Sequence, residues 1–321
     1  MEDTRKAGDA NAERLSAIAK RIGQDTAKIQ RMFVLERFLA RVQAGEHRDL
    51  FAVKGGFLMM VYGTGFTRPT EDVDLSRIGE ACPEDWIRTV VGDVAAIPSP
   101  TREDGVVFDL STLKATPITG TGEAGTMDFG LKVSFQGNVG KARCKIVLDV
   151  CGGNPIVPGV VMKEVPSLLP KEFPPLSIPC YPLEMVIAEK LHAAQWFGID
   201  NTRVKDFHDI VRLIGTNPID GGDLTAAIRA VWAHWGSVHR SGQDMAAGRG
   251  LSEDYAFNMQ DRWDAWLADF RIKGMPSDYA DVVAKVRDFA APVLDAVATG
   301  EEFGMDWMPD SGWAPKHGWT M

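Results

Sequence analysis

Residues 50–77 read LFAVKGGFLMMVYGTGFTRPTEDVDLSR. An apolar run at 50–53 is followed at once by Lys54, Gly55 and Gly56, and then by an apolar, helix-forming segment. This order is typical of a strand, a turn and a helix. Because glycines carry no side chain, backbone N–H groups at the start of the helix stay open to an anion. The stretch therefore predicts a phosphate-binding turn.

The same stretch ends in two aspartates, Asp72 and Asp74, separated by one residue. Alternate residues of a strand point to the same face, so we expect both carboxylates to project together while Val73 and Leu75 point into the core. Carboxylate oxygens are ligands that Mg²⁺ prefers. The pattern predicts a metal site beside the phosphate-binding turn.

The composition describes a globular protein of one large or two modest domains. The chain has 321 residues, 45% of them hydrophobic and 25% charged, which is enough for a sizeable core. Its formal net charge of −9 argues against indiscriminate binding to nucleic acid. A local basic patch is still compatible with binding of a specific RNA.

The cysteines and the apolar runs indicate where the protein works. Cys82, Cys144, Cys151 and Cys180 form no C-x-x-C pair and have no histidine at zinc spacing, so we expect reduced thiols. The N-terminus lacks the apolar segment of a signal peptide, and no apolar run reaches the roughly 20 residues of a membrane helix. We expect a cytoplasmic protein with no membrane contact.

Helices and then strands are predicted in the first half of the chain. Residues 1–12 are polar and lack a period, which predicts a frayed or disordered arm. The expected elements are helices at 15–22, 29–42 and 83–97, then strands between 105 and 150 with turns at 120–126 and 137–140. These strands form a meander or a series of hairpins.

The last of these strands, ARCKIVLDV at 142–150, ends near a carboxylate. Its alternation sends Cys144, Ile146 and Leu148 to one face, and Arg143, Lys145, Val147 and Asp149 to the other. Asp149 is a candidate third carboxylate. The alternative is a strand-end aspartate that caps the following Gly152-Gly153 turn, and spacing leaves both interpretations open.

Prolines mark a change of architecture between residues 154 and 181. We predict domains at 1–165 and 166–321, with helices near 182–197, 203–214, 223–240, 252–271 and 279–298. The Trp-rich tail, 300–320, predicts an irregular strap. The expected fold class is α+β: a mixed sheet with flanking helices, followed by an α-helical C-terminal lobe.

A lysine, Lys190, lies on the apolar face of the helix predicted at 182–197. Its stem must run along packed surface, and its ammonium must meet an anion. The next helix carries Asp206 and Asp209, so a salt bridge between the helices is one interpretation and phosphate binding is the other.

Two further groups of residues favour structural interpretations. The aromatic residues Trp232, Trp235, Trp263, Trp266 and Phe270 fall at helical spacings, which is typical of core. A cluster of His234, His239, Arg240 and Arg249 suits either RNA contact or, as we favour, a solvated face.

These features together match the demands of two-metal nucleotidyl transfer. A nucleoside triphosphate brings about four negative charges, and the attacking hydroxyl must lose its proton near neutral pH. Asp72 and Asp74 would hold the ions that bridge the phosphates, while Asp149 would help to hold the ion at the incoming hydroxyl and accept its proton. Gly55 and Gly56 would meet phosphate oxygens through the backbone.

Four segments resemble the AbiEii/AbiGii toxin family, whose nucleotidyltransferase-like fold is shared with DNA polymerase β. They are KGGFLMMVYG, RPTEDVDL, YPLEMVIAEKLHA and RVKDFHDIVRL, in this order, and the resemblance spans most of residues 30–215. Each motif alone is weak, but their order makes chance agreement improbable. Phe57 stands where the family commonly has a small hydroxyl residue, and Thr70 where it often has Ser.

The resemblance implies roles for individual residues. Gly55, Gly56, Asp72 and Asp74 would form the nucleotide and metal site, Lys190 would contact the triphosphate, and Asp206 would belong to the site from the helical lobe. Lys54, Arg68 and Thr70 fall in the same motifs, and we assign them to nucleotide binding. The role of Asp149 as metal ligand follows from the general fold rather than from a local motif.

Membership would also imply a bacterial or phage toxin–antitoxin system with a separate antitoxin protein. The toxin would use Mg²⁺ and an NTP to modify an RNA end, which in studied relatives is the acceptor end of tRNA. Two other functions stay open: transfer to a small-molecule or protein hydroxyl, and a nucleotide-binding regulator without catalysis. Every expected acid and the lysine are present, which argues against the regulator.

Overall fold

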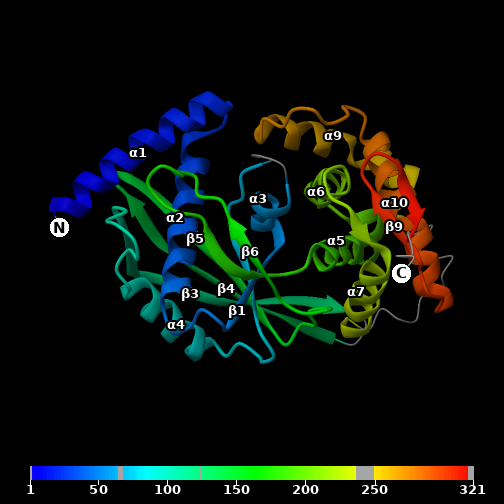
Figure 1. Ribbon diagram of the computed structural model, residues 1–321, viewed down its shortest axis with the longest axis horizontal. Coiled ribbons are helices and arrows are strands. Elements are labelled where there is room, and N and C mark those ends of the chain that lie inside the picture. The colour runs from blue at the N-terminus through cyan, green and yellow to red at the C-terminus, as the bar shows by residue number, and fades with distance from the viewer. Residues whose placement is uncertain (1, 64–67, 123–124, 236–248, 317–321) are drawn as a thin grey trace, which may run out of the picture. The chain divides into compact units, whose positions relative to one another are not determined.

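The computed structural model describes residues 2–63, 68–122, 125–235 and 249–316 (Figure 1). The chain forms two compact units. Unit 1 comprises Met1–Val61, Arg68–Asn154 and Val161–Cys180, and unit 2 comprises Tyr62–Thr67, Pro155–Val160 and Tyr181–Met321. The domain boundary near residue 165 stays a prediction, whereas the compact units change over for the last time at Cys180–Tyr181.

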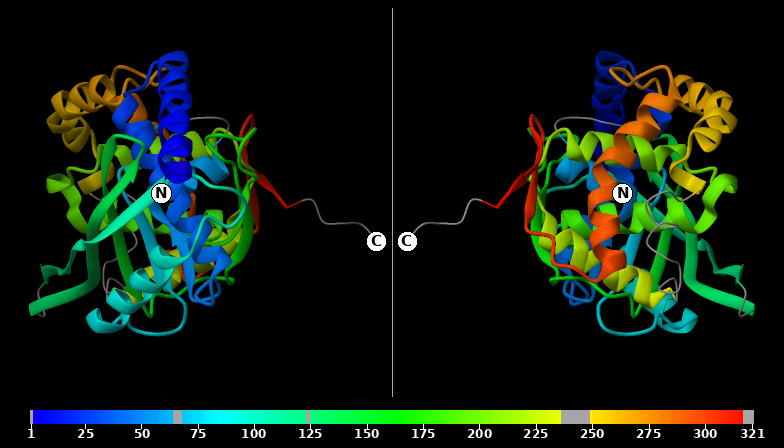
Figure 2. Two further views of the ribbon diagram at one scale, coloured as in Figure 1. Left: turned by 90° about the vertical axis from the view of Figure 1, so that its left-hand side faces the viewer. Right: turned by 90° about the vertical axis from the view of Figure 1, so that its right-hand side faces the viewer.

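Unit 1 is built on a mixed sheet of seven strands in the order β3-β4-β5-β2-β1-β7-β6. The strands are β1 (Phe51–Lys54), β2 (Val73–Arg77), β3 (Val106–Gly122), β4 (Gly125–Val139), β5 (Ala142–Gly152), β6 (Val161–Val165) and β7 (Leu176–Cys180). β2 runs parallel to β5 and β1 parallel to β7, while the other neighbours are antiparallel. The long β3–β4 ladder projects from the rest of the sheet (Figure 2).

The helices of unit 1 are α1 (Glu2–Ile22), α2 (Thr26–Ala44), η1 (Gly55–Leu58), α3 (Met59–Tyr62), whose last residue belongs to unit 2, and α4 (Glu84–Ala96). α2 runs across the strands (Figure 1), and its Phe38 packs on Phe108 and Phe135. A Cβ on Gly137 of β4 would lie 2.6 Å from Val34 Cγ1, so that position also faces α2. One face of β3, β4 and β5 is therefore covered by α2, and the helices and sheet confirm the predicted fold class for this part.

The N-terminal arm predicted at 1–12 is wrong, because α1 begins at Glu2. Its Gly8 approaches the turns of the sheet so closely that a Cβ there would lie 2.6 Å from Gly140 N and 2.8 Å from Gly105 O. Asn11 Nδ2 donates a hydrogen bond of 3.0 Å to Asp104 O. The backbone approach at Gly8 and the side-chain hydrogen bond of Asn11 fix the helix without the apolar period that sequence patterns detect.

Unit 2 contains the predicted helical lobe. Its helices are α5 (Leu183–Phe197), η2 (Gly198–Asp200), α6 (Val204–Ile214), α7 (Gly221–His234), η4 (Arg249–Leu251), α9 (Glu253–Asp269) and α10 (Tyr279–Thr299). Trp263 is fully buried and stacks on Tyr279, and Trp232 is buried as well. Trp232 and Trp263 are therefore core, as predicted, whereas the other aromatic residues of the predicted set, Trp235, Trp266 and Phe270, are only half-buried.

The tail is a β-hairpin rather than an irregular strap. β9 (Met305–Met308) and β10 (Gly312–Pro315) pair with each other, and β9 also pairs with β8 (Ile219–Asp220). Trp307 Nε1 donates to Ile214 O at 2.7 Å, and Trp313 Nε1 donates to Phe289 O at 2.9 Å. The two indoles therefore anchor the hairpin on α6 and α10, while Trp319 lies outside the described residues.

All four cysteines carry free thiols. Burial raises the pKa of Cys144 to about 11 and that of Cys180 to about 12, so both thiols stay protonated and unreactive at neutral pH. Of the helices within the described residues, none is both long and apolar enough to cross a membrane.

Candidate active site

Four charged residues share one transverse row of the sheet in unit 1. Lys54 of β1 pairs with Asp74 of β2, Asp74 pairs with Asp149 of β5, and Asp149 pairs with Lys132 of β4. Residues paired across neighbouring strands project on the same face, so these side chains lie side by side. We call Lys54, Asp74, Asp149 and Lys132 the carboxylate row.

The carboxylate row lies on the face of the sheet that α2 leaves open. Val73 and Leu75 of β2 are buried on the opposite face, and Leu148 of β5 is buried with them. Asp74 and Asp149 are half-buried. Alternation is confirmed for Val73, Asp74 and Leu75 of β2 and for β5, and it brings Asp74 and Asp149 together, whereas Asp72 lies just before the first residue of β2.

The glycine turn lies directly against Asp74. Gly55 has a φ of +66°, a left-handed conformation that favours glycine. A Cβ at this position would lie 1.9 Å from Asp74 Oδ2 and 2.6 Å from its Cγ. Glycine is thus required twice over, by the backbone conformation and by the carboxylate beside it. Phe57, two residues on, is fully buried, so its ring packs into the protein.

The segment before β2 folds over the second glycine. A Cβ on Gly56 would lie 2.9 Å from Arg68 Nη2 and 3.2 Å from Thr70 Oγ1. Arg68 and Thr70 are both buried. Thr70 Oγ1 lies 3.1 Å from Asp72 Oδ1 and 3.2 Å from Asp72 O, and donates to Asp72. The structure therefore brings the predicted nucleotide-binding residues of unit 1 to one place.

Lys132 was not among the functional residues predicted from the sequence. Its Nζ lies 3.1 Å from Asp149 Oδ1 and 3.2 Å from Asp149 Oδ2. The signal was the alternation in LKVSF, in which Leu131 and Val133 are buried and Lys132 takes the other face. The partner strand was not predictable, so neither was the ion pair. It supplies positive charge at the candidate third carboxylate.

The donor chemistry of this site fits a divalent cation. Asp74 and Asp149 are neighbours in register, and Gly55 leaves no side chain over the Asp74 carboxylate. Carboxylate oxygens are the donors that Mg²⁺ takes. Over the described ranges of the chain, however, no group of three or more His, Cys, Asp or Glu side chains is already arranged to hold a metal ion.

In unit 2, Lys190 of α5 makes the salt bridge that was one of its two interpretations. Its Nζ lies 2.9 Å from Asp206 Oδ1 and 2.9 Å from Asp209 Oδ2, both on α6. The Lys190 side chain is 8% exposed, and the two aspartate side chains are 3% and 0% exposed. One buried ammonium thus joins two buried carboxylates across the two helices.

The cluster continues at both ends. Arg203 Nε donates to Asp206 Oδ2 at 2.6 Å, and His208 Nδ1 lies 3.0 Å from Asp209 Oδ1. Burial alone would raise the pKa of Asp206, but Lys190 and Arg203 outweigh it and hold the pKa at about 2. Asp206 is therefore a carboxylate throughout the physiological range.

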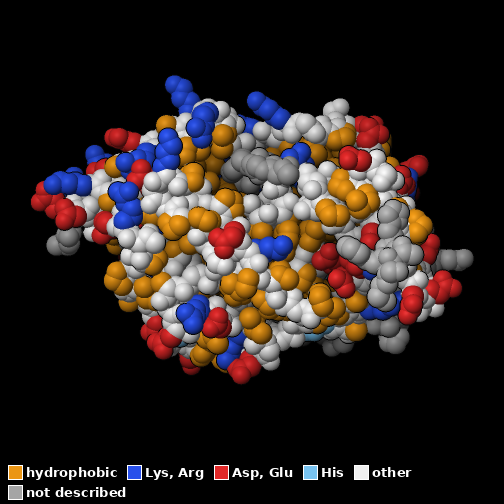
Figure 3. All heavy atoms as spheres, in the orientation of Figure 1, with side chains coloured by type: hydrophobic (Ala, Val, Ile, Leu, Met, Phe, Trp, Pro, Cys, Tyr) orange, Lys and Arg blue, Asp and Glu red, His pale blue; other side chains and the backbone are white. Residues whose placement is uncertain are grey.

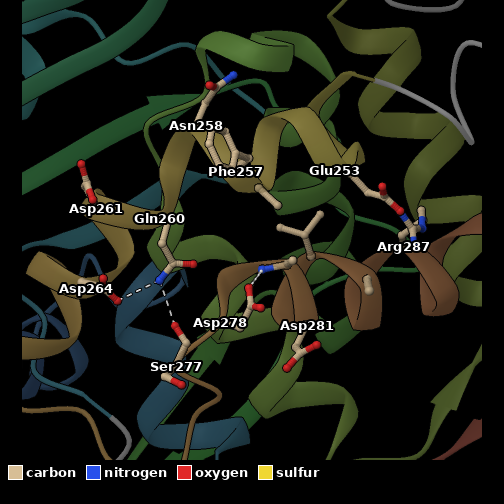
Figure 4. Close-up of a pocket in the computed structure, with 14 residues that line it drawn as sticks. Glu253, Phe257, Asn258, Gln260, Asp261, Asp264, Ser277, Asp278, Asp281 and Arg287 are labelled. Atoms are coloured by element: carbon tan, nitrogen blue, oxygen red, sulfur yellow. Dashed lines mark hydrogen bonds between the residues drawn. The ribbon is translucent and has the colours of Figure 1, made fainter.

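The cavity between α9 and α10 offers no match to nucleotide chemistry. It measures about 1120 Å³, and Figure 4 shows Asp261, Asp264, Asp278 and Asp281 along it. Gln260 Nε2 donates to Asp264 Oδ1 at 2.9 Å. These acidic walls would repel a triphosphate. The cluster predicted around His234 is only partly described, because His239 and Arg240 lie outside the described residues.

Comparison with known proteins places the chain among toxins. The family model described as "Nucleotidyl transferase AbiEii toxin, Type IV TA system" matches residues 37–289. Among solved structures, MenT4, a nucleotidyltransferase toxin from Mycobacterium tuberculosis H37Rv, is 12% identical, with a TM-score of 0.49 over 90% of this chain and 99% of that one. No curated protein sequence matches the chain.

Two structures from Helicobacter pylori are also similar. A putative nucleotidyltransferase is 14% identical, with a TM-score of 0.43 over 84% of this chain and 96% of that one. JHP933 is 12% identical, with a TM-score of 0.42 over 85% of this chain and 94% of that one.

The family match extends over most of the chain and includes the glycine turn, all three candidate carboxylates and Lys190. Activity as an NTP-dependent nucleotidyltransferase and an antitoxin partner follow from it. The protein belongs to the AbiEii family of nucleotidyltransferase toxins, from type IV toxin–antitoxin systems.

Proposed function

We propose that this toxin transfers nucleotides from an NTP to an RNA end, the acceptor end of tRNA, at the carboxylate row. The observation that carries the proposal is the pairing of Asp74 with Asp149 beside the Gly55 turn. It combines oxygen donors for a cation with a turn whose two glycines carry no side chains of their own. These are the two features that phosphoryl chemistry requires of a protein.

Asp72 and Asp74 are proposed to hold Mg²⁺, and Asp149 to complete the metal site and accept the proton of the attacking hydroxyl. The metal, when bound, would neutralise the phosphates and favour the alkoxide form of the hydroxyl. Thr70 donates to Asp72 and so orients that carboxylate. Lys132 lies 3.1 Å from Asp149 Oδ1 and so places positive charge beside the proposed proton acceptor.

The phosphate groups are proposed to lie at the turn. Backbone N–H groups of Gly55 and Gly56 would donate to phosphate oxygens, and Lys54 and Arg68 would add positive charge. Arg68 is buried beside Gly56, so its guanidinium is already positioned. Thr70 supports the same wall of the site.

The second part of the proposal concerns unit 2. Lys190 is proposed to contact the triphosphate, and Asp206 to position Lys190. The ion pairs with Asp206 and Asp209 fix the position of the ammonium in unit 2. This role can be separated from a purely structural one by measuring NTP affinity and stability together.

One incubation tests the reaction. Purified protein is mixed with each α-labelled NTP, Mg²⁺ and total cellular RNA, next to Asp74→Asn and a control, Asp109→Asn. Asp109 is an exposed carboxylate on β3 outside the carboxylate row. We expect label in RNA with the parent and the control, and none with Asp74→Asn.

Separating the labelled products of this incubation also distinguishes the alternative functions. Label confined to protein or to small molecules would replace the RNA acceptor by a protein or small-molecule hydroxyl. NTP binding without any labelled product would identify a regulator without catalysis. Because its RNA substrate is synthesised in the cytoplasm, the toxin is proposed to act there.

A further inference from the structure

The open face of β3, β4 and β5 carries basic side chains next to the carboxylate row. They are Lys114 of β3, Lys132 of β4, and Arg143 and Lys145 of β5, and we call them the basic strip. The alternation in 142–150 predicted Arg143 and Lys145 on the same face as Asp149 but gave them no role. The function proposed above does not use Lys114, Arg143 or Lys145.

Strand register places the basic strip on one face. Arg143, Lys145 and Asp149 alternate along β5 and therefore point the same way. Lys145 pairs with Gln136 of β4, and Arg143 pairs with Asn138. Lys114 pairs with Ser134, which itself pairs with Val147 of β5. The strip thus crosses three strands and ends at the carboxylate row.

The basic strip is open to solvent and locally positive. Lys114, Lys132, Arg143 and Lys145 are all exposed, although the chain as a whole has a net charge of −9. Among the described residues, Lys114, Arg143 and Lys145 have no ion-pair partner. Asp109 is an acid on the same face, and Ser111 donates to it.

The face drawn in Figure 3 intersperses acidic, basic and apolar side chains. On a protein with a net charge of −9, a run of exposed cations indicates a local binding role. From Arg143 to Asp149 the strand extends about 20 Å, which is the length of several nucleotides of a phosphate backbone.

We propose that the basic strip binds the sugar–phosphate backbone of the acceptor RNA and directs its end to the carboxylate row. The inference rests on the proposed function for the identity of the acceptor. Its cations would contact phosphates, which sets affinity and register but not sequence preference. An RNA whose 3′ end lies at Asp149 must approach that residue along the surface. The basic strip provides one such approach, because Arg143 and Lys145 precede Asp149 on the same face of β5.

The test measures binding separately from catalysis. Fluorescein-labelled bulk tRNA is titrated with the parent and with Arg143→Glu/Lys145→Glu, and fluorescence anisotropy is recorded at several salt concentrations. We expect the double variant to bind at least about tenfold more weakly and to lose about two from the slope of log affinity against log salt.

The control variant is Lys20→Glu/Lys171→Glu, which makes the same change in net charge at exposed sites of unit 1 away from the basic strip. It should bind nearly as the parent does. Equal weakening in both variants, or none in the strip variant, would overturn the proposal. Thermal melts and a charge-conserving Arg143→Lys/Lys145→Arg variant, which should bind normally, exclude misfolding as the cause.

Catalysis supplies the independent readout. If the strip positions RNA, its reversal raises KM for RNA and leaves kcat at saturating RNA unchanged. Asp74→Asn should bind tRNA as tightly as the parent and transfer nothing. If the strip variant loses tRNA binding while no RNA is ever labelled, the strip stands and the proposed reaction falls. If RNA is labelled but the strip variant binds tRNA normally, the proposed reaction is supported and the basic strip is not the RNA-binding surface.

Discussion

Asp74 and Asp149 are register partners on the parallel strands β2 and β5, although they lie far apart in the sequence. A parallel pair cannot be closed by a hairpin, so the whole segment between these strands serves as the crossover. The sheet, rather than a loop, fixes their spacing. A site built in this way should be sensitive to changes that move one carboxylate relative to the other.

Gly55→Ala should abolish transfer. The new Cβ would lie 1.9 Å from Asp74 Oδ2, and the φ of +66° adds about 1–2 kcal/mol of backbone strain. Gly79→Ala is the matched control, because Gly79 has a φ of +78° and a Cβ there would have nothing within 4 Å. In urea unfolding, backbone strain should destabilise both variants by a similar amount, whereas the clash with Asp74 and the loss of activity should occur only in Gly55→Ala. Full activity in Gly55→Ala would show that the position of the Asp74 carboxylate does not matter for catalysis.

Replacing Lys132 by alanine should strengthen the binding of a divalent cation. The Lys132 ammonium lies 3.1 Å from Asp149 Oδ1 and competes with a cation for that carboxylate. The substitution removes the ammonium and leaves Asp74 and Asp149 unchanged. The Lys132 side chain is 48% exposed, so screening limits the gain to about two- to fivefold. Calorimetric titration with Mn²⁺ measures it. Weaker binding in Lys132→Ala would show that Asp149 is no part of the metal site.

The buried cluster in unit 2 should make stability depend on acidity. The folded pKa of Asp206, about 2, lies below its ordinary value of 3.8, so the contribution of the carboxylate is complete above about pH 4. It is lost as the pH falls from about 4 to 2. Asp206→Asn should therefore unfold at lower urea than the parent at pH 7, with the gap closing towards pH 2. A gap that stays constant with pH would contradict this assignment.

Lys190→Ala should cost about 3–5 kcal/mol of unfolding free energy, because it leaves Asp206 and Asp209 buried without their shared cation. Loss of toxicity in this variant would therefore not distinguish a loss of folding from a loss of NTP binding. Lys190→Met/Asp209→Asn removes charge from both sides and should recover part of the stability. If Lys190 binds triphosphate, the double variant stays folded but loses NTP affinity in calorimetry. Unchanged affinity would leave Lys190 with a structural role alone.

Local signals were sufficient for much of the fold. The helices at 83–97, 182–197 and 203–214 start at Pro or Arg and end near Gly, Pro or Ile, and the structure has them within a residue or so. The alternation in 142–150 correctly separated the Asp149 face from the Ile146 face. Such patterns depend only on neighbours along the chain.

Pairing between segments that are distant in the sequence could not be predicted. The ion pair of Lys132 with Asp149 depends on which strands adjoin, and sequence periodicity carries no record of register. The N-terminal half of α1 was missed because Gly8 packs backbone on backbone, and the tail hairpin was missed because Gly and Pro among its tryptophans mimic a loop. For Lys190, sequence left two interpretations, and the observed ion pairs are one of them.

The central claim is that the carboxylate row transfers nucleotides to RNA ends. Sequencing of RNA 3′ ends after induced expression tests it without a choice of substrate. With the parent protein we expect untemplated nucleotides on one class of RNA, predicted to be tRNA, and none with Asp74→Asn or Asp149→Asn produced at equal levels. Growth arrest by the parent with unaltered RNA ends, or unchanged extension by the variants, would contradict the account.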